Sequence, residues 1–424
     1  MRLFLVLLLA VSVSGCGQKQ WYKGNTHTHS FWSDGNDFPE MIALWYRDRG
    51  YDFLVLSDHN VLSRGERWIK LAEIERRRGT DALAKCAARL GDDWLEFRGE
   101  GEGREVRLRN LDEVRKLVHN EQFLMVEGEE ITDRFKHHEV HTNAMNLAQV
   151  IPPPGGESVR ELMRNAILAV QRQAREHKRP ILPHLNHPNF RWSITAEDIA
   201  HVVEEEFFEV YNGHPGVGHT GDEYHAPVER LWDIANTLRI AELHAPPPYG
   251  VATDDSHHYH EGKTQTVTPG KGWIMVRAAR LEPGRLIKAM RRGDFYASSG
   301  VTLSEVKYDG KSLTVRVAAE PGAQYTIEFI GTLRDYDRTV EPRQDDKGNP
   351  VTGHYSPDIG KVLMKVEGTS ATYRLTGDEL YVRAVVHSSQ PPANPSFDGQ
   401  VAQAWTQPVG WDKHVRRGAK HHHH

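Results

Sequence analysis

Short apolar runs alternate with segments of helical periodicity between about residues 23 and 300, and most of these runs end in His, Asp or Glu. Such alternation is typical of an α/β fold, in which helices connect parallel strands. The carboxyl ends of parallel strands meet at one edge of the sheet, so the side chains that follow them gather there. The polar groups are His27-Thr28-His29, Ser33-Asp34-Gly35, Ser57-Asp58-His59-Asn60, Gly128-Glu129-Glu130, His141, His184-Leu185-Asn186-His187-Pro188 and Asp254-Asp255-Ser256-His257.

The individual elements are predicted from periodicity and capping signals. Ser158 and Glu161 form a capping-box pattern before a helix that runs to about Ala174. The other predicted helices are 195–205, 228–237 and 281–292, and the predicted strands are 51–57, 180–183, 207–211, 249–253 and 272–276.

Two regions depart from this rhythm. Residues 62–120 form a charged insertion with a predicted helix and a hairpin, and we expect it over the mouth of the sheet as a lid or a solvated addition without a role. After about residue 300 the apolar residues recur with a period of two, which predicts a small all-β, sandwich-like domain over 301–412. The α/β part, which carries the His, Asp and Glu groups, therefore spans 17–300, and 413–424 is a tail.

The N-terminus has the features of an export signal. Residues 1–16 combine one Arg, an apolar stretch too short to cross a bilayer, and Val13-Ser14-Gly15-Cys16, which resembles a bacterial lipobox. We expect lipid attachment at Cys16 and anchoring at the bacterial cell envelope, in the periplasm or on the surface. The alternative is an ordinary secretory signal followed by an incidental Cys. His421 to His424 are excluded from ligand counting because an oligo-His tail binds metal without any function.

Composition narrows the function classes. The net charge of −5 and the lack of a long basic run argue against a nucleic-acid partner. With Cys16 lipidated, Cys86 is the only remaining thiol, so intramolecular disulfides are excluded. We expect membrane contact through the lipid anchor alone, and the sequence identifies no protein partner.

The strongest chemical signal is the pairing of His and Asp two residues apart. Alternate residues of a strand face the same side about 3.3 Å per residue apart, so His27 and His29 can converge on one ion. With 25 His in 424 residues, about one and a half His-x-His pairs are expected by chance. The second pair, Asp255-x-His257, supplies the context that the first one needs.

Jointly these pieces resemble the polymerase and histidinol phosphatase (PHP) domain, a family of metallohydrolases, and within it the branch of the carbaryl hydrolases. The resemblance covers about residues 23–300. It rests on Asn25-Thr26-His27-Thr28-His29, Ser33-Asp34-Gly35, Ser57-Asp58-His59-Asn60, Gly128-Glu129-Glu130-Ile131, Asn186-His187-Pro188, Glu209-Val210-Tyr211-Asn212-Gly213 and Asp255-Ser256-His257.

The resemblance implies a distorted seven-stranded β/α barrel with two or three divalent ions, Zn, Mn or Fe, at the C-terminal ends of its strands. Carried over to this sequence, it gives one ion to His27, His29 and Asp255. Glu130 bridges to a second ion held by His141 and His187, and a third ion takes Asp34, His59 and His257. Family members often have His where Asp34 stands, so the occupancy of the third site stays open.

Several of these assignments have close competitors. Glu130 and Glu129 point to opposite faces of a strand, so only one of them reaches the ions, and Glu130 matches the family spacing. His187 is preferred to His184 because of the Pro that follows it. His137 and His138 are expected in an exposed loop. Asp58 and Asp254 are candidates for orienting a ligand imidazole or shuttling a proton.

These residues predict a hydrolase in which metal-activated water attacks an electrophilic centre. Arg191 is a candidate anchor for an anionic substrate, with an ordinary surface Arg as the alternative. The favoured substrate is a small phosphoester, and a carbamate or carboxylic ester is the close alternative. A lipoprotein that uses the metal only to hold a ligand is the alternative from another functional class. We find no nucleophile elbow and no phosphate-binding Gly-rich loop.

Overall fold

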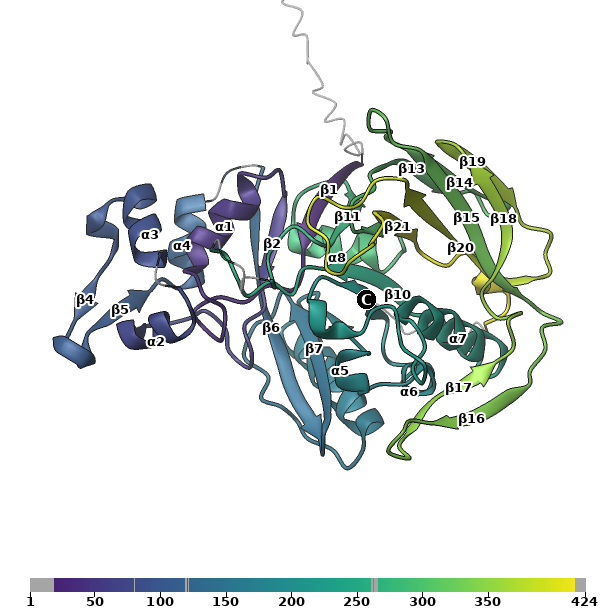
Figure 1. Cartoon of the computed structure of the whole chain (residues 1–424), viewed down its shortest axis with the longest axis horizontal. Coiled ribbons are helices and arrows are strands. Elements are labelled where there is room, and N and C mark those ends of the chain that lie inside the picture. Colours follow the sequence, from purple (N-terminus) through teal and green to yellow (C-terminus); the bar gives the residue numbers. More distant parts are fainter. Residues whose placement is uncertain are drawn as a thin grey trace, which may run out of the picture.

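The computed structural model describes residues 19–79, 81–118, 120, 122–260, 262 and 266–415. The predicted export signal, Cys16 and the terminal His residues lie outside this part of the chain. Within it, the structure contains no helix with the length and apolar character needed to cross a membrane. Figure 1 shows the insertion around α3, β4 and β5 at one end of the molecule and the C-terminal strands at the other.

One half of a large mixed sheet carries the His, Asp and Glu motifs. Seven of its strands follow one another in the order β10-β9-β8-β7-β6-β2-β1. Their bounds are β1 Gln20–Asn25, β2 Phe53–Leu56, β6 Leu124–Phe135, β7 His138–Met145, β8 Leu182–Leu185, β9 Phe207–Asn212 and β10 Tyr249–Thr253. A parallel bridge between Thr28 and Ser256 joins the segments that follow the first and last strands of this arc. The closed seven-stranded barrel stays a prediction.

The expectation of an all-parallel sheet is wrong at one strand. β7 runs antiparallel to both β6 and β8, while the other neighbours in the arc are parallel. β6 extends to Phe135 and turns back directly into β7, with Lys136 in the left-handed region at φ 58°. His137 is exposed in this turn as expected, but His138 is half-buried and begins β7.

Five helices cover the arc; α5 to α8 form where periodicity predicts them, although α6 ends before residue 205, and α1 was not predicted. They are α1 Pro39–Arg47, α5 Val159–Glu176, α6 Ala196–His201, α7 Val228–Ala241 and α8 Pro283–Met290. At the start of α5 the Ser158 side chain accepts a hydrogen bond from the Glu161 amide, whereas the Glu161 carboxylate accepts one from the Glu157 amide. The reciprocal half of the predicted capping box is therefore missing. The apolar face of α5, with Leu162 and Ile167, is buried.

The insertion forms a small unit beside the segment that carries Asp34. Its elements are β3 Arg67–Lys70, α2 Leu71–Arg76, α3 Ala82–Leu90, β4 Phe97–Arg98, β5 Glu105–Leu108 and α4 Leu111–Val118. The strands pair antiparallel in the order β3-β5-β4. Its core packs against Phe31, Trp32 and Phe38 and includes Cys86, whose thiol pKa is raised by burial. The insertion thus supports the loop that follows β1.

The C-terminal strands continue the main sheet. β11 and β12 follow β1, and β21, β20, β15 and β18 extend the sheet beyond them. The bounds are β11 Trp273–Ala278, β12 Phe295–Ser298, β13 Leu303–Tyr308, β14 Ser312–Val317, β15 Tyr325–Leu333, β16 Val340–Gln344, β17 Pro350–Tyr355, β18 Lys361–Glu367, β19 Ser370–Arg374, β20 Glu379–Ser388 and β21 Gln403–Thr406. A second sheet, β13-β14-β19, packs on β15 and β20 through a shared apolar core, giving two facing sheets.

The two halves of the chain are joined by more than a linker. β21 pairs antiparallel with β12, and Trp405 shares an apolar core with Trp232 of α7. The buried Arg383 guanidinium donates to Asp233 at 2.7 and 2.8 Å, which ties β20 to α7. A charge buried this deeply is stable only with its partner, so the two halves depend on each other.

Candidate metal centre

All nine predicted metal ligands meet at one end of the arc. His27 and His29 follow β1, His59 follows β2, His187 follows β8, and Asp255 follows β10. The backbone holds these segments together, because the Asp255 amide donates to the His27 carbonyl at 3.0 Å. Their ligand atoms form four overlapping clusters, His27-His29-Glu130, His27-His187-Asp255, His59-Glu130-His141 and His29-Asp34-His59-His257, each with its atoms within 4.8 Å of one another.

The most deeply buried cluster lies between His27, His29, Asp255 and Glu130. The Nε2 atoms of His27 and His29 each lie 3.2 Å from Asp255 Oδ1. They lie 3.4 and 3.3 Å from the two Glu130 oxygens, respectively. Two ligand atoms on one tetrahedral Zn²⁺, at bond lengths of about 2.0–2.1 Å, are about 3.3 Å apart. The spacing therefore fits a shared ion.

These two nitrogens also lack another use. Both Nε2 atoms are buried and make no hydrogen bond to any residue that the structure describes. The opposite nitrogen of His27, Nδ1, is 2.7 Å from Glu209 Oε1, which leaves the Nε2 lone pair directed into the cluster. A buried polar atom without a partner is costly, and a divalent cation would satisfy both atoms at once. The donor set fits Zn²⁺, Mn²⁺ or Fe²⁺.

Glu130 lies where a bridging carboxylate would lie. Its Oε1 is 2.9 Å from His141 Nδ1 and 3.5 Å from His187 Nε2, and its Oε2 is 2.9 Å from His59 Nδ1. Asn186 donates to Oε1 at 2.7 Å and fixes the carboxylate. Glu129 points the other way and accepts from the Ile151 amide at 3.0 Å. The prediction that only one of the two glutamates reaches the cluster agrees with this geometry.

The cluster of His29, Asp34, His59 and His257 is the most exposed of the four. Asp34 Oδ1 is 3.4 Å from His257 Nε2, and its Oδ2 is 3.5 Å from His59 Nε2. The Asp34 side chain is 55% exposed, whereas those of His27 and His29 are fully buried. The His29 and His257 rings stack at 4.1 Å between the buried and the exposed clusters. An ion held here would face solvent.

The electrostatic environment of the four clusters favours the binding of cations. Burial opposes protonation of His59, but Glu130 and Asp34 outweigh it and raise the pKa of His59 to about 11. Against the same burial, Glu130 raises the pKa of His141 to about 9. Burial, with His257 and His59 nearby, lowers the pKa of His29 to about 4. Protons on the imidazoles of His59 and His141 therefore compensate the negative charge of the nearby carboxylates, as metal ions would.

The choice between His184 and His187 follows from position. His187 has φ 20°, an unusual value for a non-Gly residue, and its ring reaches Glu130. His184 belongs to none of the four clusters, and burial lowers its pKa to about 4. His184 therefore lies behind the cluster as a neutral side chain.

Asp58 and Asp254 do not contact a ligand imidazole directly. Asp58 accepts from the Ser30 amide at 2.8 Å and from the Ser33 hydroxyl at 2.6 Å, so it shapes the loop leading to Asp34. Asp254 accepts from Tyr46 and Asn25 and from the amides of residues 270–272. Burial raises the pKa of Asp254. The oxygens of both carboxylates accept hydrogen bonds from these donors and so fix the loops around the cluster, while proton transfer by Asp58 or Asp254 stays a prediction.

Arg191 lies at the rim. Its side chain is 63% exposed and pairs with Glu139 at 3.1 Å, and its backbone is left-handed at φ 51°. The other Glu139 oxygen is 3.6 Å from His141 Nε2. Arg191 is therefore two contacts away from the cluster, in reach of a substrate but already paired with one carboxylate.

Sequence reasoning gave no role to Glu209. Its buried carboxylate is within hydrogen-bond distance of His27 Nδ1 and accepts from Thr253 Oγ1 at 2.7 Å, from the His187 amide at 2.8 Å and from Asn212 Nδ2 at 2.8 Å. It thus fixes the orientation of one ligand ring and the backbone of another. The signal for this role in the sequence was the position of Glu209 in the predicted strand 207–211, which ends directly before Asn212-Gly213.

Comparisons with known proteins give structural likeness only. No protein-family model and no curated protein matches the chain. A two-domain protein from Bacteroides vulgatus that contains a predicted PHP-like metal-dependent phosphoesterase is 14% identical, with 92% of this chain and 95% of that chain covered and a TM-score of 0.38. A protein from Bifidobacterium adolescentis proposed to be a metal-dependent phosphoesterase is 13% identical, with coverages of 57% and 89% and a TM-score of 0.29. At these scores the likenesses assign neither family nor activity.

Proposed function

We propose that this chain is a metal-dependent hydrolase of the PHP type, with two or three divalent ions and a small phosphoester as its substrate. One observation carries the proposal. The Nε2 atoms of His27 and His29 are buried, lack hydrogen-bond partners among the described residues, and lie 3.2 Å from the same Asp255 oxygen. In this proposal the seven-strand arc acts as a distorted barrel, closed where Thr28 meets Ser256.

Each group around the cluster has a distinct task. Divalent ions, when bound, supply Lewis acidity and turn water into a nucleophile near neutral pH. Glu130 holds two clusters at a fixed separation, and Glu209 holds His27 in the tautomer that presents Nε2. The substrate enters from the side of Asp34, which is the exposed face. Arg191 is exposed at the rim, where it can exchange Glu139 for an anionic group of the substrate.

The test combines metal content with a substrate panel. Elemental analysis of the purified protein should give two ions per chain, or three when the Asp34 cluster is filled. With Mn²⁺ or Zn²⁺, p-nitrophenyl phosphate and bis-p-nitrophenyl phosphate should be hydrolysed faster than p-nitrophenyl acetate. Tight ligand binding without turnover of any of these compounds would instead support a metal-assisted binding protein.

The second candidate is hydrolysis of an aryl carbamate or ester. The Phe190 ring lies 5.0 Å from the His187 ring and 6.1 Å from the His214 ring, which gives the rim an aromatic wall. Such a wall favours a flat apolar leaving group. 1-Naphthyl methylcarbamate tests this candidate, because a kcat/KM higher than that for either phosphate would reverse the order of the two functions.

We further propose that the enzyme acts outside the cytoplasm and is held at the membrane by a lipid attached to Cys16. This proposal rests on the sequence pattern of residues 1–16. Radiolabelled palmitate should enter the native chain and not a Cys16→Ala variant. Equal labelling of both would remove the anchor from the proposal.

A further inference from the structure

A cavity lies far from the metal cluster, between the two halves of the chain. It has a volume of about 290 Å³ and is lined by β1, β10 and β11 on one side and by β13, β14 and residues 407–412 on the other. Trp21 in its wall lies on β1, and His27 in the metal cluster follows that strand six residues later, which is roughly 20 Å in an extended chain. The cavity therefore cannot be part of the hydrolytic site.

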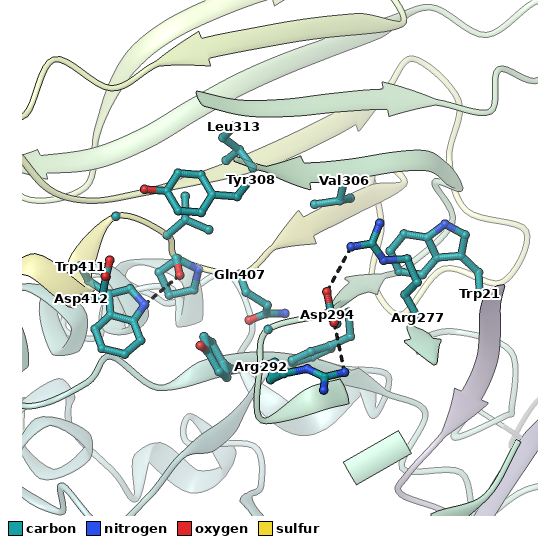
Figure 2. A pocket seen from close by; sticks show the side chains of 16 residues that line it. Trp21, Arg277, Arg292, Asp294, Val306, Tyr308, Leu313, Gln407, Trp411 and Asp412 are labelled. Carbon is teal, nitrogen blue, oxygen red and sulfur yellow. Dashed lines mark hydrogen bonds and ion pairs between the residues drawn. The ribbon is translucent and has the colours of Figure 1, made fainter. Parts of the chain in front are cut away.

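Aromatic rings make up much of its wall. Trp21, Tyr249, Tyr308 and Trp411 all line it, and all are half-buried. Figure 2 shows Trp21, Tyr308 and Trp411 around the cavity. They come from four separate segments of the chain and from both halves. Flat rings present a weakly negative face, which attracts the C–H faces of a saturated ring.

Polar groups with unused hydrogen-bonding capacity lie between the rings. Arg277 and Arg292 each spend one terminal nitrogen on Asp294, at 3.1 and 3.3 Å, as the dashed lines in Figure 2 show. Arg277 Nε is buried and has no partner within the described chain. Tyr249 and Tyr308 are also lining residues, and their hydroxyls can each donate and accept a hydrogen bond. A ligand here meets donors and acceptors in turn.

The charges of the residues that line the cavity cancel, so they do not single out an ionic ligand. Arg277 and Arg292 both contact the Asp294 carboxylate, and Asp412 adds a second negative group at the opposite wall. A phosphate would have to compete with Asp294 and would face Asp412. A ring-shaped ligand with hydroxyl edges and apolar faces meets both the rings and the unspent polar groups.

We propose that this cavity is a carbohydrate-binding site that takes one sugar unit, at its end or within a chain. The volume lies at the lower limit of small-molecule sites, about 300 Å³, and suits a single pyranose ring better than a larger cofactor. Because both halves of the chain form its walls, the β module and the catalytic half bind the sugar jointly.

The test uses the full-length, metal-loaded protein and three neutral probes: maltose, cellobiose and N,N′-diacetylchitobiose. Isothermal titration should show saturable binding of at least one probe in the millimolar range or tighter. Saturation-transfer NMR should place one sugar ring against aromatic protons. Trp411→Ala should weaken binding about tenfold through lost ring contact, and Tyr308→Phe should weaken it less, by removing a hydroxyl alone.

Trp68→Ala is the matched control, because Trp68 is a half-buried Trp on β3 of the distant insertion. It should leave sugar binding unchanged, and none of these variants should alter hydrolysis at the metal cluster. Three results would overturn the proposal: no saturable binding of any probe, equal affinity in the native protein and in folded Trp411→Ala and Tyr308→Phe variants, or preferential binding of inorganic phosphate.

Discussion

Replacing Glu209 with Gln tests whether the metal cluster depends on a carboxylate that contacts no ion site directly. Each Glu209 oxygen serves two groups: Oε1 lies 2.7 Å from both His27 Nδ1 and Thr253 Oγ1, and Oε2 accepts from the His187 amide and from Asn212 at 2.8 Å. A Gln amide has one oxygen, so two of these four donors would face an NH₂ group. An unsatisfied buried donor costs about 1–3 kcal/mol, which gives a total loss of about 2–6 kcal/mol.

The effect on metal binding should be separable from this loss of stability. His27 would lose the partner that fixes its tautomer, and changes of this kind typically cost about 10–100-fold in metal affinity. A competition titration with a chromophoric chelator measures the affinity, and urea denaturation of the apo protein measures the stability. Glu204→Gln is the control, because Glu204 only pairs with Arg164 near the surface. A folded Glu209→Gln protein with native metal affinity would refute the reasoning.

Three further predictions concern single carboxylates. Glu130→Gln should lower the metal content and reduce kcat by at least about 100-fold. Glu129→Gln should leave both quantities near their native values. Equal losses in the two variants, measured by elemental analysis and turnover, would contradict the bridging position of Glu130. Asp34→Ala should remove only the solvent-facing ion and leave the thermal midpoint of the apo protein unchanged, so loss of every ion would argue against separate clusters. Burial raises the pKa of Glu205 to about 8 in the folded protein from 4.5, so the folded state holds its proton longer than the unfolded one. Stability should fall as pH rises from about 4.5 to 8, and Glu205→Gln should flatten this part of the denaturation profile; an unchanged slope would contradict the raised pKa.

The sequence predicted the parts of the site that depend on local periodicity. His27 and His29 lie two residues apart after a strand, and their side chains converge as that spacing requires. Periodicity likewise predicted β2, β8 to β11 and the helices α5 to α8 to within a few residues, but it did not predict α1 or β7. The opposite orientation of adjacent strand residues predicted that only one of Glu129 and Glu130 reaches the cluster, and the resemblance to the family spacing selected Glu130.

The remaining features depend on contacts between distant residues. Asn25 reaches Asp254 across 229 positions, and nothing near either residue indicates that the Asp254 oxygens are already occupied. The reversal of β7 depends on a turn at Lys136 that carries no Gly. The pairing of β12 with β21 joins segments more than one hundred residues apart. The change in periodicity near residue 300 gives no sign of this pairing.

That same pairing limits how the chain can be divided. A fragment ending near residue 300 would leave the backbone groups of β12 unpaired along an open edge, where another molecule can add a strand. It would also remove Arg383 from Asp233 and expose the apolar residues of α7, such as Trp232, that pack against the C-terminal strands. Expression of the catalytic half alone should therefore give aggregates, and an excised fragment is the wrong starting material for crystallisation or for measuring turnover.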